Sequence, residues 1–594
     1  MLRKKITSYC IAVAGALIPA LIASPAAAGT DSYPAAQNIG QNGVSVIVSV
    51  PGLSFLELQG PLLQDKPHLY RLRQEASWGA MNIRTPGKGM QDVYVSWGAG
   101  APAQASPNAH VVDPGHRLAA GTGGELLFRF GGEQPSGLVV PYVGTVKRLT
   151  QLSLSTAIPG LLGSILHSHG ISTEAWGNAD TGIVHSGQEG LLRRYAGLAV
   201  MDRAGLISGG ATDDRVLRRN PLAPYGVSVN YPFLLAQLKP NSPMVTMVEL
   251  GDLQRLYEEK EAYSQERFAS LKQQVLAGLD GFVGDIMHKL GENDELWIVS
   301  PKINSDAQSL KMQLSPVIRY RDNQPGGLLT SETTHRPGIV AYTDLAPSLL
   351  ARFGLERPEA MTGFAMRSEA NPVAYVQLLG EVQKAADIYQ WRPPVLYSLA
   401  VFEVLALLAA LLTAVRPSMK WGAQRGTQIA LRQNEAARQA IRTALFVILL
   451  IPAALLWMGW FAELPFTLVL AGSLTVVGLM AYGLAKLPGK NLGYALAWSG
   501  LLNTVLIVGD TLRGAHAMQH SLLGYDTMIG ARYYGVGNEL MGVLLGAALL
   551  ALTSALQCRA DAAAAPRAAA RPAQLAAGAP QPLRWLPLPR RARR

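Results

Sequence analysis

The chain has 594 residues, which is more than one ordinary domain contains, so at least two parts are expected. Its net charge is +11, but residues 559–594 hold eight Arg against one Asp, so most of the excess lies in a tail and does not indicate a nucleic-acid partner. The two cysteines, Cys10 and Cys558, lie near the two ends, which excludes a disulfide or a thiolate metal site in residues 29–390.

The first residues have the layout of a secretory signal. "MLRKK" is basic, Ile6–Ala23 is apolar, and "SPAAAGT" offers a small-residue cleavage position after Ala28. We therefore expect a signal peptide over residues 1–28, with a retained signal anchor as the alternative. Both interpretations place the next part of the chain outside the cytoplasm, at the plasma (inner) membrane of a bacterium.

Residues 29–390 alternate strand-like and helix-like segments. This alternation predicts an exported α/β domain with a largely parallel sheet and helices on both faces, and in such sheets ligands bind at the carboxyl ends of the strands. A long helix is expected over Leu253–Leu290. The expected strands are Val44–Val50, Val93–Trp97, Leu138–Val143, Met244–Leu250, Glu295–Ser300 and Pro316–Tyr320.

The segment "IVAYTDLAPSLLARFGLERPEAMTG" (Ile339–Gly363) resembles the closing segment of the alkaline phosphatase superfamily, most of all in cofactor-independent phosphoglycerate mutases and phosphopentomutases. Residues 245–287 show that family's order of strand, acidic turn and long helix. The resemblance covers residues 44–370. It implies an alkaline phosphatase-like fold and, in active members, two zinc or manganese ions that activate a Ser or Thr nucleophile.

Several positions depart from the ligand pattern that this resemblance implies. Pro51-Gly52 follows the first strand where the family has a metal-binding Asp, and Pro51 has no ligand atom. Asp252 is kept after the strand at 244–250, but Arg255 stands where a His is expected. Ser300-Pro301-Lys302 replaces an Asp-His-Gly pattern and puts a cation where a metal needs ligands.

The positions that do match leave a small candidate set. His335 matches the last His of the family, and Thr85 is the hydroxyl nearest the nucleophile position. Thr85 is thus the catalytic candidate, and Asp252 and His335 are the metal candidates. With three positions lost, the metal site is interpreted as degenerate, and we expect a pseudoenzyme without a cofactor. If the site is active, zinc or manganese is the expected cofactor.

A glycine-rich stretch, "GNADTGIVHSGQEG" (Gly177–Gly190), contains a second set of polar groups. Asp180 and His185 are candidate ligand-binding residues, because loops carry function more often than cores do. The alternative is a polar connector in which Asn and Asp stabilise turns.

Five apolar runs are long enough to cross a bilayer, which takes roughly 20 residues. They predict a membrane domain over residues 391–558. The loop 416–442 carries six Lys or Arg against Glu435 alone, which favours a cytoplasmic position. Residues 559–594 have the composition of a disordered, lipid-attracted tail, with a shifted reading frame as the alternative explanation. The runs are Val395–Val415, Thr443–Phe461, Phe466–Ala485, Leu492–Gly509 and Leu540–Leu556.

The stretch between the fourth and fifth runs, Gly509–Gly542, is expected on the outer face and is rich in polar groups. It would receive a phosphate or a polar lipid headgroup at the interface, and the alternative is a solvated connector with interfacial tyrosines. Its candidate ligand-binding residues are Asp510, Arg513, His516, His520, Asp526, Arg532, Asn538 and Glu539.

Three functions remain open on these patterns. The first is a membrane-anchored, extracytoplasmic alkaline phosphatase-superfamily protein with a degenerate metal site, which binds a phosphate-containing or lipid-linked ligand in cell-envelope processes. The second is an active metal-dependent phosphoryl hydrolase or transferase. The third is a membrane scaffold or transporter-like protein of envelope assembly. The partners expected are the membrane and an envelope ligand.

Overall fold

A computed structural model describes residues 43–153, 155–183, 192–322, 324–415, 427–461, 464–525, 527–530, 532–533 and 535–576. The predicted signal peptide lies outside these residues. The chain splits into two compact units. Unit 1 comprises Met1–Trp391 and Tyr525–Gly535, and unit 2 comprises Arg392–Gly524 and Val536–Arg594. The short segment Tyr525–Gly535, which the apolar pattern placed with the membrane domain, therefore belongs to unit 1.

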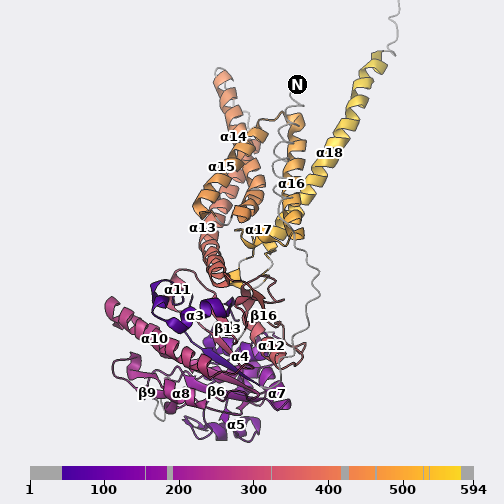
Figure 1. The fold of residues 1–594 in the computed structure, drawn as a ribbon. Coiled ribbons are helices and arrows are strands. Elements are labelled where there is room, and N and C mark those ends of the chain that lie inside the picture. The colour runs from indigo at the N-terminus through magenta and orange to yellow at the C-terminus, as the bar shows by residue number, and fades with distance from the viewer. Residues whose placement is uncertain are drawn as a thin grey trace, which may run out of the picture. The chain divides into compact units, whose positions relative to one another are not determined.

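Unit 1 is built on a ten-stranded sheet (Figure 1). The order is β16-β14-β2-β13-β12-β1-β11-β6-β8, and β15 pairs with β2. Neighbours are parallel except at β13, which is antiparallel to β12 and β2, and at β16, which is antiparallel to β14. The largely parallel sheet is confirmed. The strands are β1 (Val44–Ser49), β2 (Ser77–Asn82), β6 (Ser172–Asn178), β8 (Gly209–Ala211), β11 (Met244–Leu250), β12 (Glu295–Val299), β13 (Ser315–Tyr320), β14 (Gly327–Thr330), β15 (Ile339–Ala341) and β16 (Arg367–Ala370).

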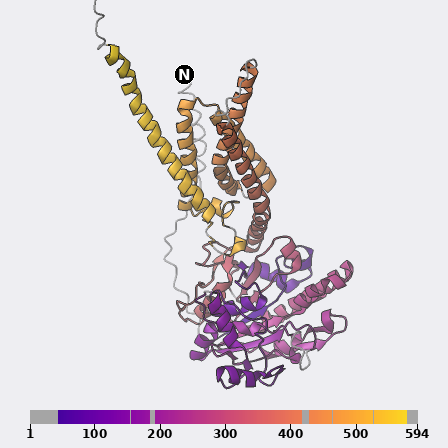
Figure 2. The ribbon, with the colours of Figure 1, turned by 180° about the vertical axis from the view of Figure 1, so that it is seen from behind.

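Both faces of the sheet are covered by helices, as the alternating pattern predicts. In β1, Val46 and Val48 belong to one apolar core and Ile47 to the other, so this strand is buried on both sides. A strand in that position needs a mainly apolar run, and Val44–Val50 provides one in which the two buried serines are hydrogen-bonded, Ser45 to Glu295 and Ser49 to Tyr94. Helices α3, α8, α9 and α10 contribute to the first core, and α4, α5, α6, α7 and α12 contribute to the second. Figure 2 shows the same unit from behind.

Three expected elements differ from the observed ones. Val93–Trp97 is not a strand but part of helix α4 (Met90–Ala99), because a short apolar run that is buried all round has no periodicity to separate helix from strand. In the segment Leu138–Val143, strand β5 ends at Val139 and helix α6 begins at Val143. The long helix is interrupted, because the Ser264 side chain accepts a hydrogen bond from Arg267 N and begins a new helix.

The remaining elements of unit 1 connect or cover the sheet. Its helices are α2 (Pro61–Gln64), α3 (Pro67–Glu75), α4 (Met90–Ala99), α5 (Gly123–Gly131), α6 (Val143–Leu152), α7 (Leu161–Ser168), α8 (Tyr231–Gln237), α9 (Asp252–Glu258), α10 (Gln265–Lys289), α11 (Ser305–Ser309) and α12 (Leu345–Arg352). Its short strands are β3 (Arg117–Leu118), β4 (Gly121–Thr122), β5 (Leu138–Val139), β7 (Leu206–Ile207), β9 (Leu217–Arg219) and β10 (Val227–Val229).

Five helices in the described part of the chain have the length and apolar composition to span a membrane, so the predicted membrane helices are confirmed. Helix α18 runs through Arg559 to Ala576, so the first part of the predicted disordered tail is helical here, and residues 577–594 lie outside the described residues. Residues 427–442 of the expected loop 416–442 are helical and belong to α14 (Thr427–Met458), and the cytoplasmic position of this basic segment stays a prediction. The helices are α13 (Ala374–Val415), α14 (Thr427–Met458), α15 (Phe466–Ala485), α16 (Gly489–Leu512), the short α17 (His516–Gln519) and α18 (Asn538–Ala576).

Candidate functional site

The parallel strands of unit 1 end at one edge of the sheet, and the loops after β1 and β12 are joined there by backbone hydrogen bonds. Val50 N donates to Val299 O at 2.9 Å, and Gly52 N donates to Lys302 O at 2.6 Å. Gly52 has φ +93°, a conformation that residues with a Cβ rarely adopt. The Pro51-Gly52 turn thus serves to hold two strand ends together, and no side chain of this turn can bind a metal.

Asp252, the carboxylate kept after β11, is fully occupied by protein partners. Arg255 Nη2 donates to its Oδ1 at 2.8 Å, Val229 N donates to the same oxygen at 3.0 Å, and Tyr231 OH donates to Oδ2 at 3.3 Å. The Arg255 side chain is completely buried. A guanidinium therefore lies where a metal ion would have to bind this carboxylate.

Asp180, after β6, has the same kind of partner. Arg194 Nε donates to its Oδ2 at 2.8 Å, and Arg193 N donates to Oδ1 at 2.6 Å. Burial raises the pKa of Asp180, while Arg194 opposes that rise. Arg255 Nη1 also donates to the Asp180 carbonyl oxygen at 3.1 Å, so one arginine bridges the ends of β6 and β11. The two carboxylates and two guanidinium groups of Asp180, Arg194, Asp252 and Arg255 balance in charge, as burial of ions requires.

Glu249, in strand β11, lies three residues before Asp252 and forms a hydrogen-bonded chain with two neighbours. Tyr94 OH donates to Glu249 Oε1 at 2.7 Å, and Ser49 Oγ lies 2.6 Å from the same hydroxyl. Burial raises the pKa of Glu249 to about 8, with the negative charge of Asp180 adding to the rise. Burial thus favours the neutral acid at pH 7.

These strand ends do not fit a pair of zinc or manganese ions. Within the described ranges, no group of three or more His, Cys, Asp or Glu is arranged to hold a metal. The structure also keeps the two metal candidates apart: His335 lies between β14 and β15, which pair with β2, whereas Asp252 follows β11. β2 and β11 are four strand spacings apart, which corresponds to roughly 19 Å. His335 itself is exposed.

Three buried side-chain atoms near Asp180 and Asp252 form no hydrogen bond within the described part of the chain. They are Glu249 Oε2, Arg255 Nε and Arg194 Nη1. Arg194 has no sequence signal beyond the dipeptide Arg193-Arg194, so its role emerges from the fold alone. Gln254 Oε1, which lies two residues after Asp252 in the chain, likewise has no partner among the described residues, so several buried polar atoms here keep unused bonding capacity.

Thr85, the candidate nucleophile, lies between β2 and α4 and is only 3% exposed. Its Oγ1 bonds to no other described residue. The loop that carries it is positioned by Asn82, the last residue of β2. Asn82 Oδ1 accepts a hydrogen bond from Arg84 N at 2.9 Å, and Asn82 Nδ2 donates to Thr527 O at 2.6 Å. Asn82 was missed in the sequence, because its partner is 445 residues away.

Asp344 belongs to the closing segment that resembles the superfamily, yet no role was expected for it. Its oxygens accept hydrogen bonds from Ala341 N at 2.9 Å, Phe364 N at 3.1 Å and the Thr333 hydroxyl. Burial raises the pKa of Asp344 to about 6. Its position in the matched motif was the available signal, and its contacts join three loops at the ends of β14 and β15.

The other predicted ligand residues are divided between the two units. His185 and Asp526 lie outside the described residues. Arg532 belongs to unit 1, where its guanidinium lies 5.6 Å from the centre of the Tyr525 ring. The remaining six belong to unit 2: Asp510, Arg513, His516, His520, Asn538 and Glu539.

Within unit 2, these residues mainly shape the backbone. Asp510 is buried and accepts hydrogen bonds from Ala517 N at 3.0 Å and Met518 N at 2.9 Å, so it forms the turn after α16. The rings of His516 and His520 are in contact at a tilt of 55°, with their centres 4.8 Å apart. Asn538 and Glu539 lie in the first turn of α18, where both are exposed, and Glu539 pairs with Arg392 at 3.5 Å.

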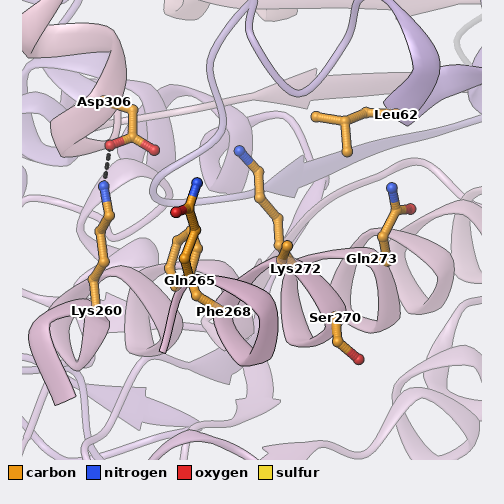
Figure 3. A pocket seen from close by; sticks show the side chains of 9 residues that line it. Leu62, Lys260, Gln265, Phe268, Ser270, Lys272, Gln273 and Asp306 are labelled. Carbon is orange, nitrogen blue, oxygen red and sulfur yellow. Dashed lines mark hydrogen bonds and ion pairs between the residues drawn. The ribbon is translucent and has the colours of Figure 1, made fainter. Parts of the chain in front are cut away.

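A pocket of about 450 Å³ lies beside α10 (Figure 3). Its two lysines are already paired, Lys260 with Asp306 and Lys272 with Glu57 at 2.5 Å. Lys272 Nζ also donates to Tyr257 OH at 2.8 Å. Because carboxylates neutralise both ammonium groups, we assign no anion to this pocket.

No family model matches the sequence, and no curated protein matches it. Similar solved structures include the lipoteichoic acid synthase LtaP from Listeria monocytogenes, with 10% identity, a TM-score of 0.33 and coverage of 58% of this chain and 80% of that one. The alkaline phosphatase from the Antarctic bacterium TAB5 is 11% identical over 53% of this chain and 98% of its own, with a TM-score of 0.29. Murine ectonucleotide pyrophosphatase/phosphodiesterase 5 is 10% identical over 53% and 96%, with a TM-score of 0.27.

These similar structures belong to the alkaline phosphatase superfamily, the group that the closing segment of this chain resembles. At these TM-scores they do not bear on the chemistry of the site. The functional argument depends on the contacts at the strand ends.

The buried acid Glu249 makes the stability of unit 1 depend on pH. Its folded pKa of about 8 lies above the ordinary value of 4.5, so the native state binds the extra proton between these values. Raising the pH from 5 to 8 should lower the free energy of unfolding of the native protein relative to Glu249→Gln, by on the order of 4 kcal/mol when the shift is complete. Unfolding of the full chain in detergent, followed at several pH values, measures this difference.

Glu295 provides the control of opposite sign. Although burial alone would raise its pKa, Arg321 at 2.7 Å and Arg319 at 3.1 Å lower it. Glu295→Gln should therefore lower the free energy of unfolding at pH 7. The stability of this variant should not rise relative to that of the native protein as the pH rises. Parallel stability curves for the native protein and Glu249→Gln would contradict the assignment of Glu249 as a neutral acid.

Proposed function

We propose that the protein is a membrane-anchored, extracytoplasmic member of the alkaline phosphatase superfamily that binds a phosphate-containing or lipid-linked ligand of the cell envelope without two-metal catalysis. The observation that supports this proposal most is the buried ion pair of Arg255 with Asp252. Arg255 occupies the Asp252 carboxylate, which a metal ion would need as a ligand. The chain is thus a pseudoenzyme with respect to the chemistry of its relatives.

The charges at the strand ends support an anionic ligand. In an active two-metal site, the metal ions supply the positive charge that a phosphoryl group requires. Here positive charge comes from side chains: Lys302 after β12 and Arg84 after β2 are both exposed. Arginine and lysine both bind phosphate, the first in a forked geometry and the second as a compact charge.

The membrane part supports a lipid-linked ligand. Five helices are apolar and long enough to span a bilayer, and the basic loop 416–442 favours an orientation that puts unit 1 outside the cytoplasm. A domain held at the membrane surface encounters lipid-borne headgroups at a high effective concentration. This is the advantage that membrane attachment gives to a binding protein with such a ligand.

The first test is the metal content and activity of the full-length protein purified in detergent. We expect much less than one equivalent of zinc or manganese by elemental analysis after dialysis against either metal, and no hydrolysis of an aryl phosphate ester. An active alkaline phosphatase treated in the same way is the control. Two equivalents of metal together with turnover would support the active hydrolase or transferase and overturn the pseudoenzyme assignment.

The second test is the class of ligand. A short-chain polyprenyl phosphate should raise the melting temperature of the full-length protein, whereas the corresponding polyprenyl alcohol should not, because the phosphate has to meet Lys302 and Arg84. Lys302→Ala should lower the affinity by about tenfold, as expected for the loss of one charged contact. Exposed Lys311, which is two residues past the end of α11, supplies the matched variant Lys311→Ala, for which no effect is expected.

Equal shifts with the phosphate and the alcohol, or unchanged affinity in Lys302→Ala, would contradict an anionic ligand at this edge.

A further inference from the structure

The segment Tyr525–Gly535 belongs to unit 1 although the chain reaches it from α16 and α17 and leaves it for α18, all in unit 2. Its described residues are 525, 527–530, 532, 533 and 535. The ends of the segment are close together, because Tyr525 N donates to Gly535 O at 2.8 Å. It therefore forms a closed, compact loop of the kind found at functional surfaces.

This loop docks on the end of β2 through a buried hydrogen bond. Asn82 Nδ2 donates to Thr527 O at 2.6 Å, and Thr527 is 2% exposed. The same Asn82 side chain accepts the hydrogen bond from Arg84 N, so one amide joins the docked loop to the loop that carries Thr85. A buried amide whose partner is removed costs about 1–3 kcal/mol, which makes this contact specific.

Apolar side chains of the loop enter the core of unit 1. Met528 is 3% exposed and Tyr533 is 5% exposed, and both belong to the apolar cluster formed by β1, β2 and α10. Burying side chains of this size contributes roughly 1.5–3 kcal/mol each. Such burial distinguishes a docked element from a surface connector.

The backbone of the loop is fitted closely to Asn82. Gly530 has φ +80°, and a Cβ placed on it would lie 2.6 Å from Asn82 Oδ1. Only glycine accommodates both the left-handed conformation and this approach. The contact is therefore specified by two residues, Asn82 on the sheet and Gly530 on the loop.

The docked loop also lies beside the closing segment of the domain. Burial raises the pKa of the Tyr533 hydroxyl, and the charges of Asp344 and Tyr342 add to the rise. Ala341, the last residue of β15, pairs with Asn82, and Asp344 accepts a hydrogen bond from Ala341 N. Because Asn82 also holds Thr527, the docked loop lies at the ends of both β2 and β15.

We propose that Tyr525–Gly535 is an intrachain strap that docks at the carboxyl end of β2 and opens as a separate element, without unfolding of the sheet. Because its two ends continue into α17 and α18, opening of the strap is linked by the chain itself to the membrane helices. Neither docking nor opening of the strap requires a ligand or a metal.

Thiol accessibility in the full-length protein tests the strap. In a Cys10→Ser/Cys558→Ser background, Thr527→Cys places a single thiol on the strap and leaves the backbone contact with Asn82 intact. We expect this thiol to react with a maleimide at least about tenfold more slowly than the thiol of Lys302→Cys, which lies at an exposed position, since a buried thiol reacts only when its segment opens.

Two variants loosen the strap, and one position reports on unfolding. Asn82→Ala removes the hydrogen bond and Gly530→Val blocks the close approach, and each should accelerate labelling at position 527 by about tenfold or more. The thiol of Ala80→Cys, in the same strand β2 and 0% exposed, should stay protected in both variants. This combination of results would establish local opening of the strap.

Each of three outcomes would overturn the proposal. The thiol at position 527 could react as fast as that at position 302 in the otherwise native chain. Its rate could stay unchanged in both Asn82→Ala and Gly530→Val. The thiols at positions 527 and 80 could accelerate together, which would mean that protection belongs to the whole unit and not to a strap. None of these readouts depends on metal content or on phosphate binding, so failure of the strap and failure of the proposed function are distinguishable.

Discussion

At the edge of the sheet where the parallel strands end, the pairing of buried charges depends on Arg255. Its guanidinium is completely buried, pairs with Asp252 at the end of β11 and donates to the carbonyl of Asp180 at the end of β6. A buried carboxylate without a partner is costly, and the positive charge needed there comes either from a metal ion or from a side chain. In this chain the side chain takes that place, and Arg194 does the same for Asp180.

Other features of the edge are consistent with this arrangement. Glu249 is kept neutral by burial, so it adds no charge that a cation would have to balance. Pro51-Gly52 and Lys302 contribute backbone contacts between β1 and β12 instead of ligand atoms. The fold therefore combines a mostly parallel sheet with an edge whose buried carboxylates Asp180 and Asp252 are paired with arginines. Binding of an anion to exposed cations is the function that we propose for this edge.

Features that depend on local pattern were predictable from the sequence. Buried strands such as β11 need mainly apolar runs, and membrane helices need longer ones, so both were expected at nearly the observed positions. The helix α4 was missed for the same reason, because Val93–Trp97 is apolar enough for either structure. The departures at Pro51 and Arg255 from the ligand pattern that the resemblance implies were also visible, because these residues are read directly from the sequence.

The contacts that define the site were not predictable, because they join distant parts of the chain. Arg255 reaches a carbonyl 75 residues earlier, and Asn82 reaches one 445 residues later. Nothing in the local sequence of Thr527 or Gly530 separates a docked strap from a polar connector between two membrane helices. Only the fold shows that Asp252 and His335 follow strands on different parts of the sheet.

The most direct test of the Arg255 pairing is a double-mutant cycle with Asp252→Asn and Arg255→Met, in which the free energy of unfolding of the full-length protein is measured for all four chains. If the buried guanidinium has taken the place of a metal, the coupling energy should be on the order of 2 kcal/mol or more, because either single change leaves an unpaired charge. A coupling energy near zero would mean that the two groups act independently, and would contradict the account.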